Sequence, residues 1–465
     1  MAAWRTCAAR LAAVAFAVGV PGLAAPADAT AGGSGGRCPV RALDRADEPV
    51  EITFWHVQQA RNEEILVEQI EQFEASQDRV RVELVNQLTY PDVFEKYKAA
   101  LATDGLPDLV QMDEAAVQSM VDSRSTIPIE RCVEADDYSL DDFVPQTIDY
   151  YTTKGVLRAM PWTVSNPVLF YDKNDFRAAG LDPEVPPQTF EEVTEYAQRM
   201  VDAGAARYGM TVRAEASVNE AFYAKSGKLY MNHENGRDAR ATKTLLDTRT
   251  GVEIWTWWGD MIDSGLGLFT GSQPANFDNL YALGTGDAAM TIDTSNAIGS
   301  ILGVLDTGEF GAVDLGVGPL PTLEPGGGVP VGDASLWIPK TGSRRQAAAW
   351  ELVKFFSAPE QQAAYAVGNS GGYVPIRTSA VEDPALQAMW AENPELKIPY
   401  EQLEAGTRSP AAVGAVTGDY AGVRAAVRDA LTAMFTEGVP PKRALAQAQR
   451  DATDAIREYN ARVGI

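Results

Sequence analysis

Between residues 50 and 122, short alternating or apolar runs take turns with longer runs whose apolar residues recur every three or four positions. The period of two predicts strands, and the longer spacing predicts amphipathic helices. The predicted order is strand 50–57, helix 61–76, strand 80–84, helix 91–103, strand 108–112 and helix 114–122. This order is typical of an open α/β sheet, in which ligands bind beyond the carboxyl ends of the strands. Those ends carry Trp55, His56, Gln87, Tyr90, Asp113 and Glu114.

The stretch from Pro161 to Val193 contains three different patterns. Residues 161–167 predict a polar turn between two prolines, and the apolar residues 168–171 predict a short buried strand. Residues 172–180 predict a short helix that ends at a glycine, and Thr189 with Glu192 forms a capping box for the next helix. Because a polar turn here leads into a buried strand, we expect the chain to cross between two lobes at this point.

The remainder of the chain is predicted to be mostly helical. Helices are expected at 190–203, 243–246, 253–262, 346–356, 419–435 and 441–459. Residues 288–292 predict a strand, and residues 329–339 predict a second strand that crosses between the lobes. The sequence contains no internal repeats.

Composition places the chain among globular proteins with room for two or three domains, because 45% of its 465 residues are apolar and 22% are charged. The formal net charge is −25. Nucleic-acid binding needs a basic face to contact phosphates, so this charge argues against a nucleic-acid partner. The net charge does not decide the charge of a small ligand, because one buried arginine is enough to hold an anion.

The N-terminus has the features of a secretory signal peptide. Arg5 and Arg10 precede an apolar run over residues 11–23 that is too short to span a bilayer. Residues 29–31 offer a cleavage site, with residues 25–27 as a competing one. We therefore expect a signal peptide at 1–31, a spacer at 32–49 and a mature protein outside the cytoplasm, periplasmic or associated with the cell surface; a retained anchor is disfavoured by length.

Two of the three cysteines, Cys38 and Cys132, remain after removal of Cys7 with the signal peptide. An even pair in an oxidising compartment predicts a disulfide. The alternative is lipid attachment at Cys38. The preceding Gly35, Gly36 and Arg37 do not fit the apolar and small residues expected before a lipidated cysteine, so the disulfide is favoured.

The sequence lacks the usual signatures of catalysis and of cofactor binding. It has two histidines, no HExxH or CxxC motif, no GxGxxG motif, no P-loop and no GxSxG elbow that precedes a helix. We therefore expect no metal, no cofactor and no catalytic residues. The chain is predicted to be a binding protein, with a secreted carbohydrate-active hydrolase as the alternative, because an acidic protein offers many carboxylate pairs.

Several segments together carry a resemblance to a known family: TFWH at 53–56, SNPVLFYDKNDFRAAGLDPEVPPQTFEEV at 165–193, AAMT at 288–291, DASLW at 333–337, GYVPI at 372–376 and VR at 423–424. The chain resembles the bacterial extracellular solute-binding proteins of carbohydrate-type ABC importers, and within them those that bind sn-glycerol 3-phosphate. This implies a type II periplasmic-binding-protein fold of class α/β, with discontinuous lobes at 50–163 plus 334–378 and at 164–333 plus 379–465. It also implies permease subunits as partners and a monomeric protein.

The same resemblance implies a ligand site between the lobes, formed by Tyr90, Glu114, Ser165, Thr294, Asp333, Tyr373 and Arg424. Arg424 is expected to pair with phosphate, whereas Asp333 replaces a glycine of the family. A carboxylate there repels phosphate or pairs with Arg424 and accepts sugar hydroxyls. The segment after Tyr208 and Gly209 also departs from the family's tryptophan-rich loop. The expected ligand is a glycerol phosphate or glycerophosphodiester, with a neutral sugar or oligosaccharide as the alternative.

Two tryptophans and a histidine near the strand ends have more than one interpretation. For Trp55 and Trp162 two interpretations are equally favoured: a core residue, or a platform on which a ligand stacks. His56 is expected to be a hydrogen-bonded structural residue rather than a ligand contact.

Overall fold

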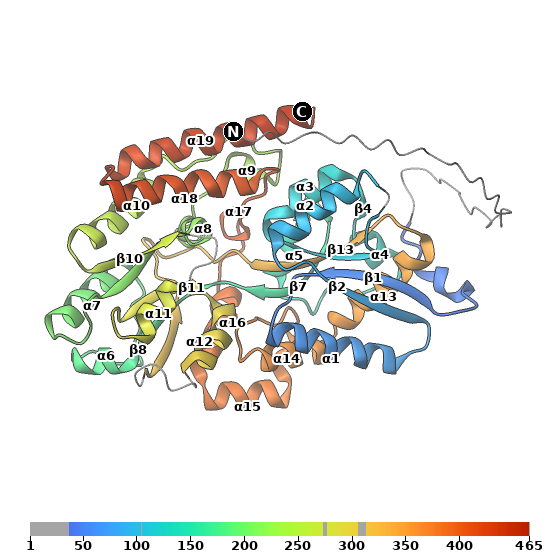
Figure 1. Ribbon diagram of the computed structural model, residues 1–465, viewed down its shortest axis with the longest axis horizontal. Helices are drawn as coiled ribbons and strands as arrows, with labels where there is room; N and C mark the ends of the chain where they lie inside the picture. The colour runs from blue at the N-terminus through green and yellow to red at the C-terminus, as the bar shows by residue number, and fades with distance from the viewer. Residues whose placement is uncertain (1–36, 104, 273–276, 306–312, 465) are drawn as a thin grey trace, which may run out of the picture. The chain divides into compact units, whose positions relative to one another are not determined.

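The three strands predicted within residues 50–122 belong to one sheet in the computed structural model of the chain, and the predicted helices pack against it (Figure 1). The structure describes residues 37–103, 105–272, 277–305 and 313–464. The predicted signal peptide at 1–31 and the first part of the spacer lie outside these residues. Within the described ranges, no helix is both long and apolar enough to cross a bilayer.

The first sheet contains six strands in the order β2-β1-β3-β13-β4, with β7 also paired to β13. β1 is parallel to β2 and β3, whereas β13 is antiparallel to its neighbours. The strands are β1 (Val50–His56), β2 (Val80–Asn86), β3 (Leu109–Asp113), β4 (Thr126–Ile127), β7 (Met160–Ser165) and β13 (Gly332–Pro339). Helices α1 and α14 lie on one side of this sheet, and α2 and α3 lie on the other (Figure 1).

The helical segments around the first sheet include the four that were predicted, at 61–76, 91–103, 114–122 and 346–356, and several that were not. They are η1 (Val40–Arg45), α1 (Arg61–Ser76), α2 (Tyr90–Ala100), η2 (Glu114–Ala116), α3 (Val117–Ser123), α4 (Glu130–Ala135), α5 (Pro145–Tyr151), α13 (Ser343–Phe356) and α14 (Pro359–Gly368). A short hairpin, β5 (Thr152–Thr153) and β6 (Val156–Leu157), follows α5. Helix α1 buries its predicted face, Leu66, Ile70 and Phe73, because these residues share one side at helical spacing.

The second group of strands has a different topology. β8 (Pro167–Asp172) lies between β11 (Met290–Thr294) and β12 (Leu315–Pro319), and both pairings are antiparallel. β9 (Met210–Ala214) and β10 (Gly267–Ser272) form a parallel pair beside them. The helical segments here are α6 (Lys173–Ala178), α7 (Phe190–Asp202), α8 (Ala216–Lys225), α9 (Asn232–Gly236), α10 (Arg249–Asp263), α11 (Asp278–Gly284), η3 (Ser295–Ala297) and α12 (Ile298–Leu305). The predicted capping box at Thr189 and Glu192 is confirmed at the start of α7.

The prediction of a polar turn at 161–167 is wrong. Residues 160–165 form strand β7, and every one of them is buried. Pro161 is tolerated because β7 has its ladder with β13 on one side only, and an edge strand leaves one row of backbone groups outside the ladder. The chain does change sheets here, but over the single residue Asn166 between β7 and β8. It returns between β12 and β13, as expected of a second crossing strand.

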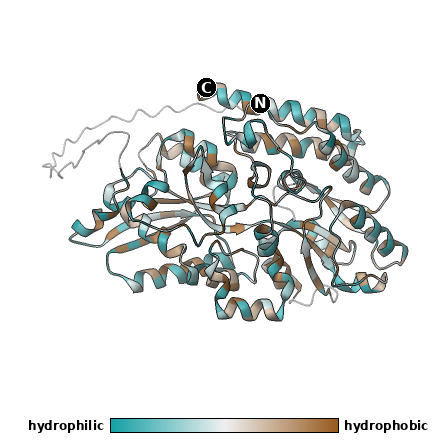
Figure 2. Ribbon diagram, turned by 180° about the vertical axis from the view of Figure 1, so that it is seen from behind, coloured by the Kyte–Doolittle hydropathy of each residue, from teal (hydrophilic) through white to brown (hydrophobic). Residues whose placement is uncertain are grey.

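The C-terminal third packs mainly as helices. They are η4 (Ser379–Glu382), α15 (Pro384–Glu392), η5 (Pro394–Lys397), α16 (Ile398–Glu404), α17 (Pro410–Val413), α18 (Tyr420–Glu437) and α19 (Pro441–Arg462). Hydrophilic and hydrophobic residues alternate along the last two helices (Figure 2), as expected of helices with one buried face. The predicted helix at 243–246 is wrong: Thr244 bridges Met231 in extended backbone, since Gln449 of α19 binds the backbone of this segment.

The predicted disulfide between Cys38 and Cys132 is confirmed. The two cysteines are 94 residues apart in sequence and both are buried. The bond joins the segment before η1 to α4. It therefore attaches the start of the described chain to the first sheet and occupies the Cys38 sulfur that lipid attachment would require.

The architecture consists of two α/β lobes, one around each group of strands, between which the chain passes more than once. Each lobe is therefore discontinuous in sequence. The residue bounds of the two lobes given above stay a prediction.

Candidate ligand-binding site

A cavity of about 230 Å³ lies where β3, β7 and β13 of the first sheet approach α8 and α18. Six of the seven residues predicted for a ligand site line it: Tyr90, Glu114, Ser165, Thr294, Asp333 and Arg424. They come from segments that are far apart in the sequence. The fold therefore brings together most of the predicted set in one polar hollow.

Local structure explains why the first sheet contributes carboxylates to this cavity. Asp113 is the last residue of β3, and its Oδ1 accepts a hydrogen bond from the Ala116 backbone N–H at 3.2 Å, which caps η2. Glu114 follows directly. Because the parallel strands of an α/β sheet end at one edge, both acids lie beside Tyr90, which begins the helix after β2.

Asp333 is the centre of a hydrogen-bond cluster in the cavity wall. Its carboxylate accepts hydrogen bonds from the Tyr90 hydroxyl at 2.6 Å, Asn296 Nδ2 at 2.7 Å and the Ser165 hydroxyl at 3.3 Å. Its backbone has φ +82°, in the left-handed region, at a point where the register of β13 with β7 shifts. This conformation favours glycine, the residue that the family resemblance places here.

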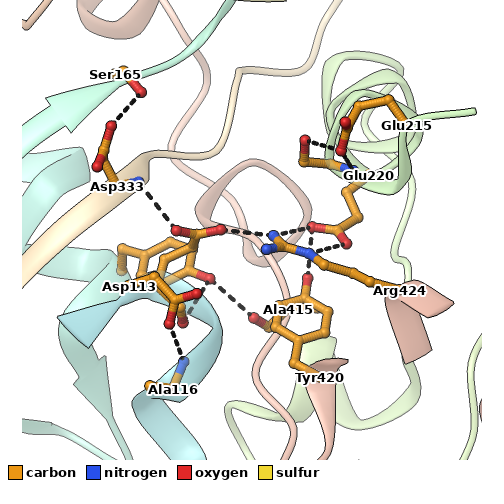
Figure 3. A network of polar contacts seen from close by, with 12 residues as sticks. Asp113, Ala116, Ser165, Glu215, Glu220, Asp333, Ala415, Tyr420 and Arg424 are labelled. Carbon is orange, nitrogen blue, oxygen red and sulfur yellow. Dashed lines mark hydrogen bonds and ion pairs between the residues drawn. The ribbon is translucent and has the colours of Figure 1, made fainter. Parts of the chain in front are cut away.

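Arg424, on α18, is held by two carboxylates rather than by Asp333 (Figure 3). Its Nη2 donates to Glu114 Oε1 at 2.7 Å and to Glu220 Oε2 at 3.0 Å, and its Nε donates to Glu220 Oε1 at 2.9 Å. Glu114 Oε2 in turn accepts the backbone N–H of Asp333 at 3.0 Å. The expectation that Asp333 itself is the partner of Arg424 is therefore wrong, because Glu114 lies between the two side chains.

The electrostatics of the cavity reflect an excess of carboxylates. Burial, and then the nearby charge of Glu114, raise the pKa of Asp113 to about 7. Burial likewise raises the pKa of Asp333 to about 6, although its hydrogen bond from Tyr90 works in the opposite direction. Burial disfavours the charge of Arg424, but Glu220 and Glu114 outweigh burial and hold the pKa of Arg424 well above its usual value.

Of the other residues singled out by the sequence, Thr294 lines the cavity, whereas Tyr373 and Trp162 do not. The Thr294 hydroxyl donates to Asn296 Oδ1 at 2.5 Å, so it acts on the residue that binds Asp333. Tyr373 is buried and does not line the cavity; its ring packs edge-on against Tyr365 with centroids 5.4 Å apart. Trp162 is 1% exposed and packs against Phe54 and Phe356, so it belongs to the core.

Near the same strand ends, Trp55 and His56 also lie away from the cavity. Trp55 is 7% exposed, with the Lys96 ammonium 4.6 Å from its ring centroid. His56 is buried, and burial lowers its pKa. Both are core residues of the first lobe. His56 is therefore structural, as expected, but its buried Nδ1 has no hydrogen-bond partner among the described residues, so the expected hydrogen bond is not found at that nitrogen.

Sequence reasoning missed Glu220, Asn296 and Tyr420. Glu220 lies on α8, where it is surrounded by buried apolar and small residues, and Tyr420 begins α18. The signal for Glu220 is the one charged residue between Val218 and Ala224, a stretch otherwise dominated by apolar and small residues, since such a charge needs a buried partner. Asn296 lies in η3, directly after β11, and was not assigned to the site.

We expect the raised pKa of Asp113 to make stability depend on pH. A carboxyl whose pKa is raised on folding binds more protons in the folded state, so its stabilising contribution is complete below about pH 4 and is lost as pH rises through about 7. The free energy of unfolding of the wild type relative to Asp113→Asn should therefore fall between about pH 5 and pH 8, on the order of 1–3 kcal/mol.

Urea unfolding of both proteins across this range measures the difference. Subtracting one unfolding free energy from the other removes the contributions of other groups that titrate in this range. These are His56, whose pKa is lowered by burial, and Asp175, whose pKa is raised by burial to about 7. Asp47→Asn, at an exposed position, is the matched control. A difference between wild type and Asp113→Asn that is constant with pH would contradict the assignment.

Comparison with solved structures defines the class of protein. The fold matches a cyclic alpha-maltosyl-1,6-maltose binding protein from Arthrobacter globiformis with a TM-score of 0.70 and 22% identity, over 88% of this chain and 100% of that one. It matches the sugar-binding protein MalE from Xanthomonas citri with a TM-score of 0.73 and 20% identity, over 88% and 98% of the two chains. The fold is therefore that of the type II periplasmic binding proteins, which confirms the predicted fold class.

The chain belongs to the family described as bacterial extracellular solute-binding protein, which matches residues 68–398. It is 26% identical over 422 residues to the sn-glycerol-3-phosphate-binding periplasmic protein UgpB of Rhizobium meliloti (strain 1021), which covers 89% of this chain and 95% of that one. A solved structure of UgpB from Mycobacterium tuberculosis in complex with glycerophosphocholine matches with a TM-score of 0.71 and 22% identity, over 89% and 99%. The family consists of substrate-binding proteins of ABC importers rather than catalysts.

Proposed function

We propose that this chain is the solute-binding component of an ABC importer that captures an uncharged polyhydroxylated ligand of the sugar class. The observation that carries the proposal is the set of carboxylates in the cavity wall, Asp113, Glu114, Glu220 and Asp333. Carboxylate oxygens accept hydrogen bonds from sugar hydroxyls, and the neighbouring Tyr90 and Ser165 hydroxyls add donors and acceptors. A wall of this kind suits a ligand with many hydroxyls and no negative charge.

The cationic side chains of the cavity also favour an uncharged ligand, because both are already paired with carboxylates. Among the described residues that line the cavity, the cationic side chains are Arg424 and Lys228. Arg424 already binds two carboxylates, and Lys228 is half-exposed and pairs with Glu324 at 3.1 Å. Like charges disfavour each other in a buried site, so a phosphate here is opposed by the carboxylates. The glycerol phosphate ligand stays a prediction, supported by the names of the relatives.

The space around the site favours a ligand larger than glycerol. A second cavity, of about 620 Å³, shares Tyr90, Asp113 and Tyr420 with the first. Ligand pockets for small molecules are about 300–1,000 Å³. The first cavity alone is below this range, whereas the two together are within it, which supports a sugar of more than one ring.

Delivery follows from the class of protein. We infer that the lobes close on the ligand and that the closed form docks as a monomer on permease subunits, in a process of hinge closure rather than catalysis. The chain is inferred to be exported from the cytoplasm by means of the signal peptide at 1–31. Neither a cofactor nor a nucleic acid takes part in the binding and delivery of the ligand.

Calorimetric titration with maltose, trehalose, sn-glycerol 3-phosphate and glycerophosphocholine tests the ligand class. We expect heat of binding with a neutral sugar and none with glycerol 3-phosphate. Tight binding of either phosphorylated ligand without a response to any sugar would reject the proposal. Chromatography of the recovered ligand distinguishes binding from hydrolysis, because a binding protein returns it unchanged and a hydrolase returns its products.

A further inference from the structure

Glu220 has a position that the family resemblance does not account for. It lies on α8, whose residues Val218 to Ala224 are all buried, and its side chain is 9% exposed. Ser217 and Ala224, on the same face of the helix, line the cavity together with it. Glu220 is therefore a charged part of the cavity wall and not a surface residue.

The carboxylate of Glu220 occupies one side of the Arg424 guanidinium. Both of its oxygens take part, with Nε to Oε1 at 2.9 Å and Nη2 to Oε2 at 3.0 Å (Figure 3). This paired, parallel geometry is the one by which arginine binds carboxylates and phosphates most strongly. The Nε–Nη2 edge of Arg424 is thus already filled by a group of the chain itself, and the Nη1–Nη2 edge shares its Nη2 with Glu114 Oε1.

Tyr420 contacts both members of the Glu220–Arg424 ion pair and holds them in place. Its hydroxyl donates to Glu220 Oε2 at 2.9 Å, and its ring lies under the guanidinium, whose Cζ is 4.7 Å from the ring centroid. Tyr420 is 3% exposed. The contact with the ring adds a cation–π attraction, so Arg424 is held towards Glu220 by two different interactions.

We propose that Glu220 is a specificity-determining residue that excludes phosphate esters from the cavity by occupying Arg424. A phosphate that binds Arg424 at this edge must displace Glu220, which leaves a buried carboxylate without its cation beside the anionic ligand. An uncharged ligand does not compete for the guanidinium and meets no such opposition. The inference rests on the proposed function, because it assumes that this cavity is the ligand site.

Glu220→Gln in the full mature chain tests the inference, since it removes the charge and keeps the size of the side chain. We expect this variant to bind sn-glycerol 3-phosphate and inorganic phosphate at least tenfold more tightly than the wild type. The gain should shrink as salt is added, because it comes from an uncovered charge. Glu253→Gln, which removes the same charge from an exposed pair with Arg249 on α10, should leave the affinity for both anions unchanged.

Tyr420→Phe provides a second variant that keeps every charge and loosens Glu220 by removing its hydroxyl donor. We expect a smaller gain in affinity for both anions. If neither variant binds the anions more tightly than the wild type, while thermal unfolding remains cooperative, the inference is overturned. A sugar that still binds the wild type would then leave the proposed function standing. If the wild type binds glycerol 3-phosphate tightly and Glu220→Gln weakens that binding, both ideas fail.

Discussion

Replacing Arg424 with methionine is expected to lower the free energy of unfolding at pH 7 by about 3–5 kcal/mol. The guanidinium is the shared cation of Glu114 and Glu220, whose side chains are 12% and 9% exposed. Methionine fills similar space without charge, so both carboxylates lose their cation in a site with little solvent. Each must then remain ionised without a partner or take up a proton, and both outcomes cost free energy.

Urea unfolding, followed by tryptophan fluorescence, measures the effect of Arg424→Met. Arg249→Met is the matched control, because Arg249 also pairs with a glutamate but is 91% exposed, and exposed pairs contribute about 0–1 kcal/mol. The double variant Arg424→Met with Glu220→Gln should recover part of the loss, since one stranded charge is removed. A loss below about 1 kcal/mol for Arg424→Met would mean that the carboxylates are solvated and that the site is not a closed ion-pair cluster.

Asp333→Ala is expected to weaken the binding of a neutral sugar roughly 10- to 100-fold, because a hydrogen bond to a charged group contributes about 1.5–3 kcal/mol. Asp333→Gly should weaken it by a similar factor. The two variants differ in the backbone: at φ +82° alanine is strained and glycine is not. We therefore expect the glycine variant to be more stable than the alanine variant by about 1 kcal/mol.

Calorimetry with the sugar found in the screen and urea unfolding measure the two parts of this prediction. Gly438→Ala is the control for the effect of alanine at a positive φ, because Gly438 has φ +66° and no atom within 4 Å of an added Cβ. It should lower the free energy of unfolding by a similar amount. Equal stability of the two Asp333 variants would contradict backbone strain at this position.

The binding results have two further outcomes. If both variants bind sugar as the wild type does, Asp333 is no ligand contact. If Asp333→Gly tightens the binding of glycerol 3-phosphate, the prediction of a phosphorylated ligand gains support.

The local pattern of the sequence was enough to predict most of the fold. Helix α1, the strands β1 to β3 and the capping box of α7 follow from periodicity and from short-range hydrogen bonds, which depend on neighbouring residues only. The same reasoning failed where distant contacts decide the conformation. Residues 161–167 have prolines and hydroxyls typical of a turn, yet residues 160–165 form a buried strand because β13, from far along the chain, supplies the pairing.

The family resemblance in the sequence also named six residues that the fold brings to one cavity. Only the tertiary structure decided what Arg424 binds. Its partners, Glu220 and Glu114, are 204 and 310 residues away in the sequence, and an ion pair leaves no local pattern at such separations. The sequence by itself therefore determined the class of the protein and named most of the predicted residues that line this cavity. The charge that the site presents to a ligand depends on which buried side chains meet, and that was settled by the packing of α8 and α18 against the first sheet.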